Sequence, residues 1–271
     1  MESAFLLYKS SRIHYQTGGN GSQLLLCFHG YGESSGSFAF LEDGLSPDFT
    51  LLAIDLPFHG RTEWRDGLSF SPEDLLAIIG QIVTAMAFPI SAWTLMGYSM
   101  GGRIALQLVQ DIPEKIRKVV LIAPDGLRMN KWYWLATQTD PGNRLFRWTM
   151  QKPGWFFFIL RAGNALKLVN RSVYKFTAYY IGDTRVRDDL YRRWTTMRGF
   201  RPDLAQVRRE ILQKNIPIRM LYGRYDRIIR WERAETFLDG LDPNGELVIL
   251  NTGHQLLQSQ NLDTLLALVK G

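Results

Sequence analysis

A serine stands in the middle of a five-residue segment whose composition suits a nucleophile. The segment is Gly97-Tyr98-Ser99-Met100-Gly101; the residues before it, Ser91 to Met96, read as a strand, and apolar residues recur at helical spacing from Ile104 to Val109. A serine on a tight strand-to-helix turn holds its hydroxyl clear of the backbone, and such a strained turn needs small neighbours. The pattern predicts that Ser99 attacks an acyl carbon, provided that a base, an acid and an oxyanion hole accompany it.

Two polar residues late in the chain could supply the base and the acid. His254, preceded by Gly253, follows the predicted strand Glu246–Leu250, and Asp226 follows the predicted strand Pro217–Tyr222. Serine needs a base within hydrogen-bond reach, and the base needs an acid that holds its tautomer. We therefore expect His254 to take the serine proton and Asp226 to orient His254.

Other residues compete for these roles. Asp239 and Asp242 could supply the acid, but they fall at the end of a predicted helix rather than at the end of a strand. His14 lies inside a predicted strand and is interpreted as structural. Asp55 and His59 flank a turn after another strand, where we expect them to bond loop backbone.

A glycine-rich loop could polarise the substrate carbonyl. His29-Gly30-Tyr31-Gly32 follows Gln23–Phe28, a nearly all-apolar segment typical of a strand that is buried on both faces. Glycines at such a position let the chain turn sharply and leave backbone N–H groups available to an oxyanion. An ordinary strand-to-helix turn is the alternative interpretation of this loop.

Strand and helix patterns alternate through most of the chain. The predicted strands are Ser11–Gln16, Gln23–Phe28, Phe49–Asp55, Ser91–Met96, Lys118–Ala123, Pro217–Tyr222 and Glu246–Leu250. Repeated β-α units imply an α/β fold with a mostly parallel sheet covered by helices on both faces. In such sheets function gathers at the carboxyl ends of the strands, so the loops at Tyr31, Ser99, Asp226 and His254 should meet at one edge.

The alternation is interrupted between Asp125 and Asn215. This segment holds 18 Lys and Arg against 7 Asp and Glu, whereas the rest of the chain holds 14 against 19, and five of the eight tryptophans fall in it. Its patterns are helical and rich in arginine and aromatic residues. We expect residues 1–124 and 216–271 to form the α/β core and residues 125–215 to form an inserted helical lid.

Composition limits the remaining possibilities. The chain has 271 residues, of which 46% are hydrophobic, and no apolar run approaches the roughly 20 residues that cross a bilayer. The apolar run near Met1 is too short for a signal peptide and lacks a basic lead-in. The single cysteine, Cys27, falls inside an apolar strand and is interpreted as buried filler. A cytoplasmic location is the resulting expectation.

Taken together, the motifs resemble those of the α/β-hydrolase superfamily over essentially the whole chain. They are His29-Gly30-Tyr31-Gly32, Asp55-Leu56-Pro57-Phe58-His59-Gly60, Gly97-Tyr98-Ser99-Met100-Gly101-Gly102, Gly223-Arg224-Tyr225-Asp226 and Gly253-His254. The resemblance implies Ser99 as nucleophile, Asp226 as acid and His254 as base. It also implies an oxyanion hole formed by the N–H groups of Tyr31 and Met100, and no metal or organic cofactor. Phe58 departs from the pattern, because a glycine is common there, but this concerns a loop and not the triad.

The resemblance leaves the reaction open. The segment Gly97–Gly102 around Ser99, which we call the elbow, is with the following Arg103 also similar to the elbow of the menaquinone-pathway lyase. That enzyme eliminates pyruvate from a polyanionic substrate, and its matching arginine contacts the substrate. A basic lid would suit such a substrate, since guanidinium groups bind carboxylates. A salt bridge is the alternative for Arg103. Carbon–carbon bond hydrolases are a further neighbour. We favour a serine hydrolase that cleaves an ester or related acyl bond of a small molecule.

The aromatic residues of the insertion have two interpretations. Trp132 and Trp155 are expected to line the inner face of a lid and contact substrate. Alternatively, Trp155–Phe158 could lie in a lipid headgroup layer; the basic residues that follow are Arg161, Lys167, Arg171 and Lys175. A non-catalytic binding protein of this family would be expected to lack the triad. Nucleic acid is not an expected partner, because no recognition motif accompanies the basic segment.

Overall fold

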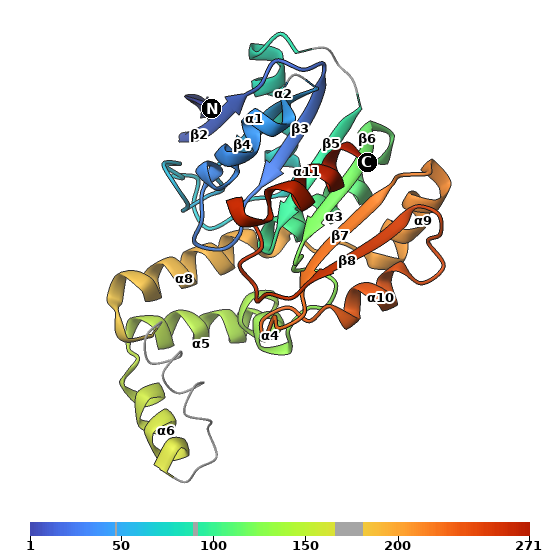
Figure 1. Cartoon of the computed structure of the whole chain (residues 1–271). Helices are drawn as coiled ribbons and strands as arrows, with labels where there is room; N and C mark the ends of the chain where they lie inside the picture. The colour runs from blue at the N-terminus through green and yellow to red at the C-terminus, as the bar shows by residue number, and fades with distance from the viewer. Residues whose placement is uncertain (47, 89–91, 166–180) are drawn as a thin grey trace. The chain divides into compact units, whose positions relative to one another are not determined.

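The buried apolar runs assemble into one eight-stranded sheet in the computed structural model of the chain (Figure 1). The structure describes residues 1–46, 48–88, 92–165 and 181–271. The strands are β1 (Glu2–Tyr8), β2 (Ser11–Gly18), β3 (Gln23–Phe28), β4 (Phe49–Ile54), β5 (Trp93–Tyr98), β6 (Ile116–Ile122), β7 (Ile218–Gly223) and β8 (Gly245–Leu250), in the order β1-β2-β4-β3-β5-β6-β7-β8. β2 pairs antiparallel with β1 on one side and with β4 on the other, and all other neighbouring strands pair in parallel. The predicted mostly parallel α/β sheet is confirmed.

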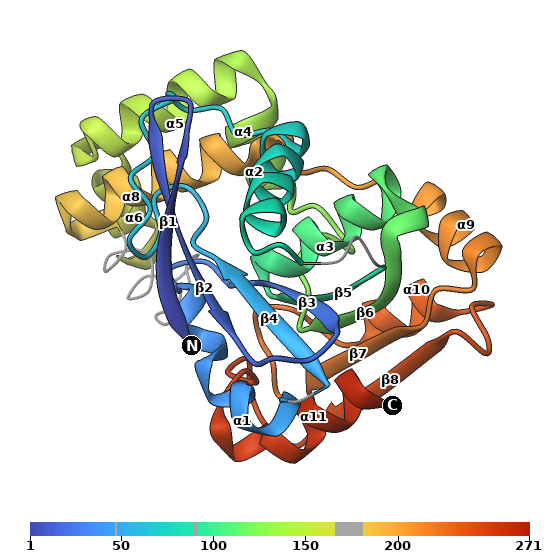
Figure 2. The same ribbon diagram turned by 90° about the horizontal axis from the view of Figure 1, so that it is seen from above.

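Helices cover both faces of this sheet (Figure 2). They are α1 (Glu42–Leu45), α2 (Pro72–Ala85), α3 (Met100–Asp111), α9 (Leu204–Lys214), α10 (Glu232–Leu238) and α11 (Leu262–Lys270), with short 3₁₀ turns η1 (Ser35–Leu41), η2 (Pro113–Lys115) and η4 (Ser259–Asn261). α1 and α11 contact each other on one face, and α2, α3 and α9 lie on the other. All six residues of β4 and of β5 are buried as a result, which explains why these strands are apolar without alternation.

The chain divides into two compact units. The first comprises Met1–Asp66, Ser71–Arg128 and Gly199–Gly271, and the second comprises Gly67–Phe70 and Met129–Arg198. The second unit is shorter than the predicted insertion, because the segment from Gly199 onward packs on α3. The backbone N–H groups of Arg201 and Asp203 donate to the side chains of Gln107 and Gln110 on α3, at 2.9 and 2.7 Å.

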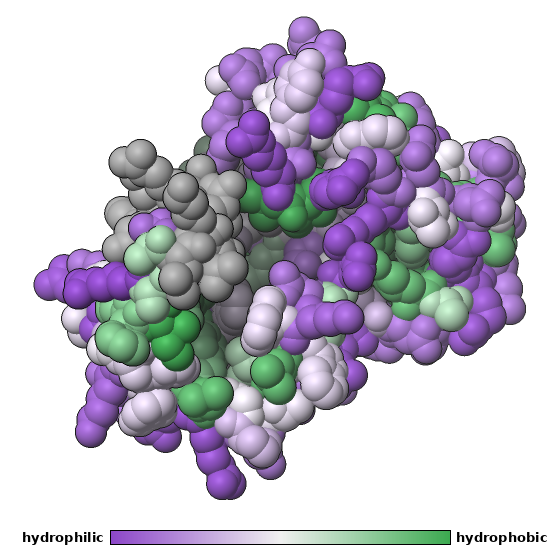
Figure 3. All heavy atoms as spheres, turned by 90° about the horizontal axis from the view of Figure 1, so that it is seen from below, coloured by the Kyte–Doolittle hydropathy of each residue, from purple (hydrophilic) through white to green (hydrophobic). Residues whose placement is uncertain are grey.

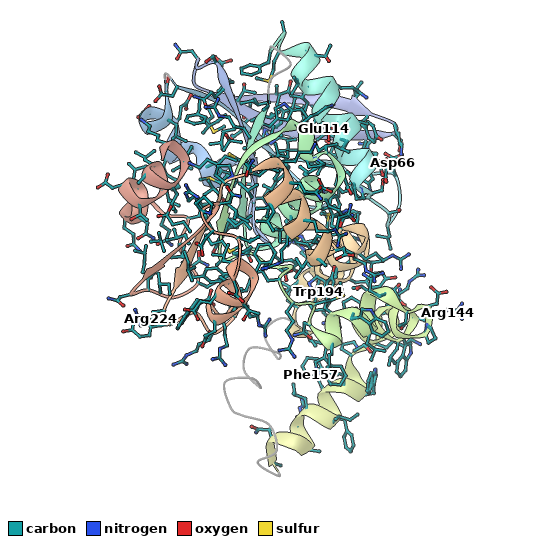
Figure 4. All side chains as sticks on the ribbon, turned by 90° about the vertical axis from the view of Figure 1, so that its right-hand side faces the viewer. Asp66, Glu114, Arg144, Phe157, Trp194 and Arg224 are labelled. Atoms are coloured by element: carbon teal, nitrogen blue, oxygen red, sulfur yellow. The ribbon has the colours of Figure 1, made fainter. Side chains whose placement is uncertain are left out.

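Four helices make up most of the described second unit. They are α4 (Lys131–Gln138), α5 (Asp140–Gln151), α6 (Gly154–Ala165) and α8 (Thr184–Thr196), followed by the 3₁₀ turn η3 (Met197–Gly199). The ring of Trp194 on α8 packs 5.1 Å from Tyr133 of α4 and 5.6 Å from Phe146 of α5 (Figure 4). Arg187, buried on α8, donates to the carbonyls of Met150 and Ile181 at 2.9 and 2.7 Å. None of the helices in the described ranges is long and apolar enough to span a membrane.

Candidate active site

Ser99 occupies a strained turn between β5 and α3. Its backbone has φ 50° and ψ −113°, a left-handed conformation that costs about 1–3 kcal/mol in a residue with a side chain. Three backbone hydrogen bonds hold it there: its N–H donates to Ile122 at 2.9 Å, and its carbonyl accepts from Gly102 and Asp125 at 2.9 and 2.8 Å. β6 and the loop that follows it therefore fix the position of the serine.

The glycines two positions either side of Ser99 are required by close packing. A Cβ atom at Gly101 would lie 1.9 Å from the carbonyl oxygen of Phe28, and one at Gly97 would lie 2.5 Å from the carbonyl oxygen of Gly101. Both distances are far below contact, and both obstacles are backbone atoms that cannot move aside cheaply. The spacing of glycines in the sequence thus records the approach of the elbow to β3 and to itself.

Asp226 and His254 lie on neighbouring loops that follow β7 and β8. The two loops are joined through backbone atoms, because Arg224 N–H donates to Leu250 at 2.8 Å and Tyr225 N–H donates to Thr252 at 2.9 Å. The separation between Asp226 and His254 is therefore set by main-chain geometry at the carboxyl edge of the sheet.

The three side chains predicted to form the triad form one hydrogen-bonded chain. His254 Nδ1 lies 2.7 Å from Asp226 Oδ2, and His254 Nε2 lies 3.2 Å from Ser99 Oγ. A carboxylate is an acceptor, so Nδ1 carries the ring proton and Nε2 is left to accept the serine hydroxyl. This arrangement can transfer a proton from the serine to the imidazole.

The environment keeps Asp226 ionised. Burial alone would raise the pKa of this carboxyl, but the His254 ring and the backbone N–H groups of Ile229 and Ile228 outweigh burial, so its pKa lies below the usual range. The two N–H groups donate to Oδ1 at 2.9 and 2.7 Å, which leaves Oδ2 for His254. A charged Asp226 can stabilise an imidazolium.

The loop after β3 lies against the elbow. A Cβ atom at Gly30 would be 3.4 Å from the Cβ of Ser99, and Tyr31 is the next residue. His29 shapes the turn: its Nδ1 lies 2.8 Å from the Gly30 carbonyl, and its Nε2 accepts from Leu56 N–H at 3.1 Å. The second residue of the expected oxyanion hole, Met100, begins α3, where first-turn N–H groups have no acceptor within the helix.

The Asp55 carboxylate accepts hydrogen bonds from loop backbone, as expected, and its histidine partner is His14 rather than the neighbouring His59. Asp55 Oδ2 lies 2.7 Å from His14 Nδ1, while His59 Nδ1 lies 2.9 Å from the carbonyl of Pro57. Asp55 also accepts the N–H groups of Ser35 at 2.6 Å and of Arg61 at 2.7 Å. It joins β2 to the loop that continues from Tyr31.

Glu33 is a site residue that the sequence reasoning missed. It lies two residues after Tyr31, and its N–H donates to Gly30 at 3.2 Å. Burial raises its pKa, against the opposing effects of Ser37, Gly30 and nearby His254. Burial raises the pKa of Tyr98, and the charge of Glu33 adds to this effect. The Tyr98 hydroxyl donates to the His254 carbonyl at 3.1 Å. The glycines and serines around Glu33 in the sequence gave no indication that this carboxyl lies near the site.

The residues expected to bind substrate are placed as follows. Arg103, whose side chain is only 7% exposed, forms an ion pair with Asp125 at 3.0 Å. Trp132 is 77% exposed on α4, and Trp155 on α6 stacks on Trp148 with ring centroids 5.4 Å apart. Both tryptophans belong to the second unit, and their contact with substrate stays a prediction. Lys167, Arg171 and Lys175 lie outside the described residues.

Comparison with known proteins gives one family and several relatives. Residues 23–257 match the family model described as alpha/beta hydrolase fold. The chain is 32% identical over 124 residues to a pimeloyl-[acyl-carrier protein] methyl ester esterase of Nitrosomonas europaea, which covers 45% of this chain and 46% of that protein. It is 33% identical over 116 residues to a dihydrolipoyllysine-residue acetyltransferase component of an acetoin cleaving system of Cupriavidus necator, covering 42% of this chain and 30% of that protein. The matched segments thus span less than half of these relatives.

Solved structures show a similar fold. The thioesterase domain from the curacin biosynthetic pathway superposes with a TM-score of 0.67 at 17% identity, covering 100% of this chain and 99% of that one. An esterase from Exiguobacterium antarcticum superposes with a TM-score of 0.64 at 17% identity, covering 100% of both chains. At such low identity the likeness concerns the arrangement of helices and strands.

Proposed function

This chain belongs to the alpha/beta hydrolase fold family, and we propose that it is a serine esterase that cleaves an ester or related acyl bond of a small molecule. The observation that carries the proposal is the position of His254, which reaches Asp226 with one ring nitrogen and Ser99 with the other. The esterases among its relatives support the same class of reaction.

The proposed reaction has two halves. Ser99 Oγ attacks the acyl carbon while His254 Nε2 takes the hydroxyl proton, and the negative charge moves to the former carbonyl oxygen. The imidazolium then gives this proton to the leaving alkoxide, so an alcohol departs and an acyl-serine remains. Water attacks the acyl-serine with His254 again as base, and Ser99 leaves with its proton restored.

The oxyanion would be held by backbone groups. We assign this role to the N–H groups of Tyr31 and Met100, because the first follows the turn that lies against Ser99 and the second begins the helix after it. The positive end of α3 would add to the effect. Substituting the side chain of Tyr31 or Met100 leaves its backbone N–H group in place, so we do not expect activity to require these particular side chains.

Arg103 favours the esterase over the polyanion lyase. Its guanidinium is buried and already pairs with Asp125, a carboxylate of the same chain, instead of standing available to a substrate carboxylate. This ion pair supports a structural role for Arg103 on α3. We therefore propose no lyase activity.

Active-site labelling tests the proposal. A fluorophosphonate probe should modify the wild-type protein and Ser259→Ala, an exposed serine control, but leave Ser99→Ala unlabelled. Hydrolysis of p-nitrophenyl and methyl esters should fall by about 10⁴-fold or more in Ser99→Ala. Labelling that persists in this variant, or release of pyruvate from a polyanionic substrate without ester cleavage, would refute the esterase.

A further inference from the structure

Two neighbouring helices of the second unit expose large apolar side chains. Leu145 and Trp148 on α5 are 49% and 46% exposed, and Phe158 and Ile159 on α6 are 75% and 56% exposed. Trp148 stacks on Trp155 of α6 at an interplanar angle of 16°, so the two helices contact each other through these rings. We refer to these four exposed residues, together with the basic residues Arg144, Arg147, Lys152 and Arg161, as the α5–α6 face.

The exposed residues are additional to those that pack the helices. α5 buries Gly142, Thr149 and Met150, and α6 buries Leu160. Leu145, Trp148, Phe158 and Ile159 lie elsewhere on these helices. Figure 3 shows hydrophobic side chains interleaved with hydrophilic ones across the surface that this view presents. Large apolar side chains exposed on two helices that contact each other mark a surface that binds a partner.

The charge on these two helices is almost entirely positive. Arg144 and Arg147 are exposed on α5, Lys152 follows that helix, and Arg161 is exposed on α6, with Arg144 labelled in Figure 4. Between residues 140 and 165 the only acidic residue is Asp140, at the first position of α5. Within the described ranges, no ion pair joins any of these four cations to a carboxylate.

We propose that the α5–α6 face binds the surface of an anionic lipid bilayer. Trp, Phe, Leu and Ile side chains suit the boundary between headgroups and acyl chains, and guanidinium groups bind lipid phosphates in pairs of hydrogen bonds. These four cations would lie at the depth of the phosphates, where each is attracted by the surface potential. This proposal is independent of the catalytic one, since binding would not need Ser99.

Vesicle co-sedimentation of the whole chain tests the proposal. Vesicles of phosphatidylcholine alone are compared with vesicles that also contain phosphatidylglycerol, at low and at high salt. We expect strong binding only to the anionic vesicles and loss of most binding at high salt. Arg144→Glu/Arg147→Glu should weaken it at least about tenfold, and Phe158→Ser/Ile159→Ser should weaken it at low and high salt alike.

A second helix supplies matched controls. Arg209 and Leu212 are likewise exposed on α9 of the first unit, so Arg209→Glu/Leu212→Ser reverses one charge and removes one large apolar side chain elsewhere. This variant should bind anionic vesicles as the wild type does, and all variants should keep the wild-type circular dichroism spectrum and fluorophosphonate labelling. Equal binding to neutral and anionic vesicles, or equal losses in the α9 variant, would overturn the proposal. So would self-association or capture of an acidic protein through this face in a chain that ignores anionic vesicles.

Discussion

Asp55 lies 2.7 Å from a ring nitrogen of His14, the same distance that separates Asp226 from His254. The two pairs differ in their surroundings. His14 of β2 and Asp55, the residue after β4, are both buried, and Asp55 also accepts backbone N–H groups from two loops. The other pair faces Ser99. One histidine–aspartate contact thus braces the fold, while the other is proposed to move a proton.

Replacing Asp226 tests the orienting role. Asp226→Asn keeps the shape of the side chain but presents an amide to His254 Nδ1, so the ring is expected to adopt the wrong tautomer. Ester hydrolysis should fall by about 10³–10⁴-fold in kcat, with little change in KM. Asp239→Asn, at an exposed rival acid, is the control and should hydrolyse at the wild-type rate. Equal losses in both variants would contradict the assignment.

Replacing Asp55 should affect stability and its pH dependence. Asp55→Asn removes a buried charged acceptor of Ser35 and Arg61 N–H groups, and we expect urea denaturation at neutral pH to show a loss of about 1–3 kcal/mol.

The pH dependence of that loss has a definite sign. Burial opposes ionisation, but the bonds from Ser35, Arg61 and His14 hold the pKa of Asp55 below its ordinary value of 3.8. Its contribution is therefore present above the unfolded-state pKa and is lost as the pH falls through the folded-state pKa. The gap between wild type and Asp55→Asn should be constant near neutrality and narrow below about pH 4. A gap that widens in acid would refute this account.

Glu33 should behave in the opposite sense. Burial raises the pKa of this carboxyl above its ordinary value of 4.5. Its contribution is present below the unfolded-state pKa and is lost as the pH rises through the folded-state pKa. Glu33→Gln should therefore gain stability relative to wild type as the pH rises above the ordinary pKa of 4.5, measured by urea denaturation. Glu114→Gln, at an exposed glutamate labelled in Figure 4, should show no such trend.

A pair of glycine substitutions tests the packing of the elbow. Gly101→Ala places a methyl group 1.9 Å from a backbone oxygen and should destabilise the protein by about 2–3 kcal/mol or more. Gly80→Ala has open space around the new group inside α2 and should stabilise by about 0.5–1 kcal/mol. Thermal unfolding of the two variants should shift in opposite directions.

Much of the core could be predicted from the sequence, because buried parallel strands leave uninterrupted apolar runs. β1 was not predicted as a strand: it is the edge strand of the sheet, beside β2, and carries a mixed pattern with exposed Leu7. The extent of the insertion was also hidden, since α9 has the same arginine-rich composition as the second unit but packs on α3.

The candidate site followed from loops rather than from side chains alone. Ser99, Asp226 and His254 are predicted as a triad because each lies in a loop that directly follows a strand and contains glycine. Glu33 gave no such signal, since its position depends on how the loop after β3 folds back onto Gly30. The partner of Arg103 was equally hidden, because Asp125 is a loop residue with nothing in its sequence to mark it as an ion-pair partner.

The backbone ladder between the loops after β7 and β8 has a consequence for protein engineering. Because main-chain atoms of Arg224, Tyr225, Leu250 and Thr252 make these bonds, the side chains at those positions are not needed to keep the acid beside the base. A combinatorial library that varies them is therefore expected to retain turnover. The same freedom would let natural lineages change these positions without rebuilding their machinery.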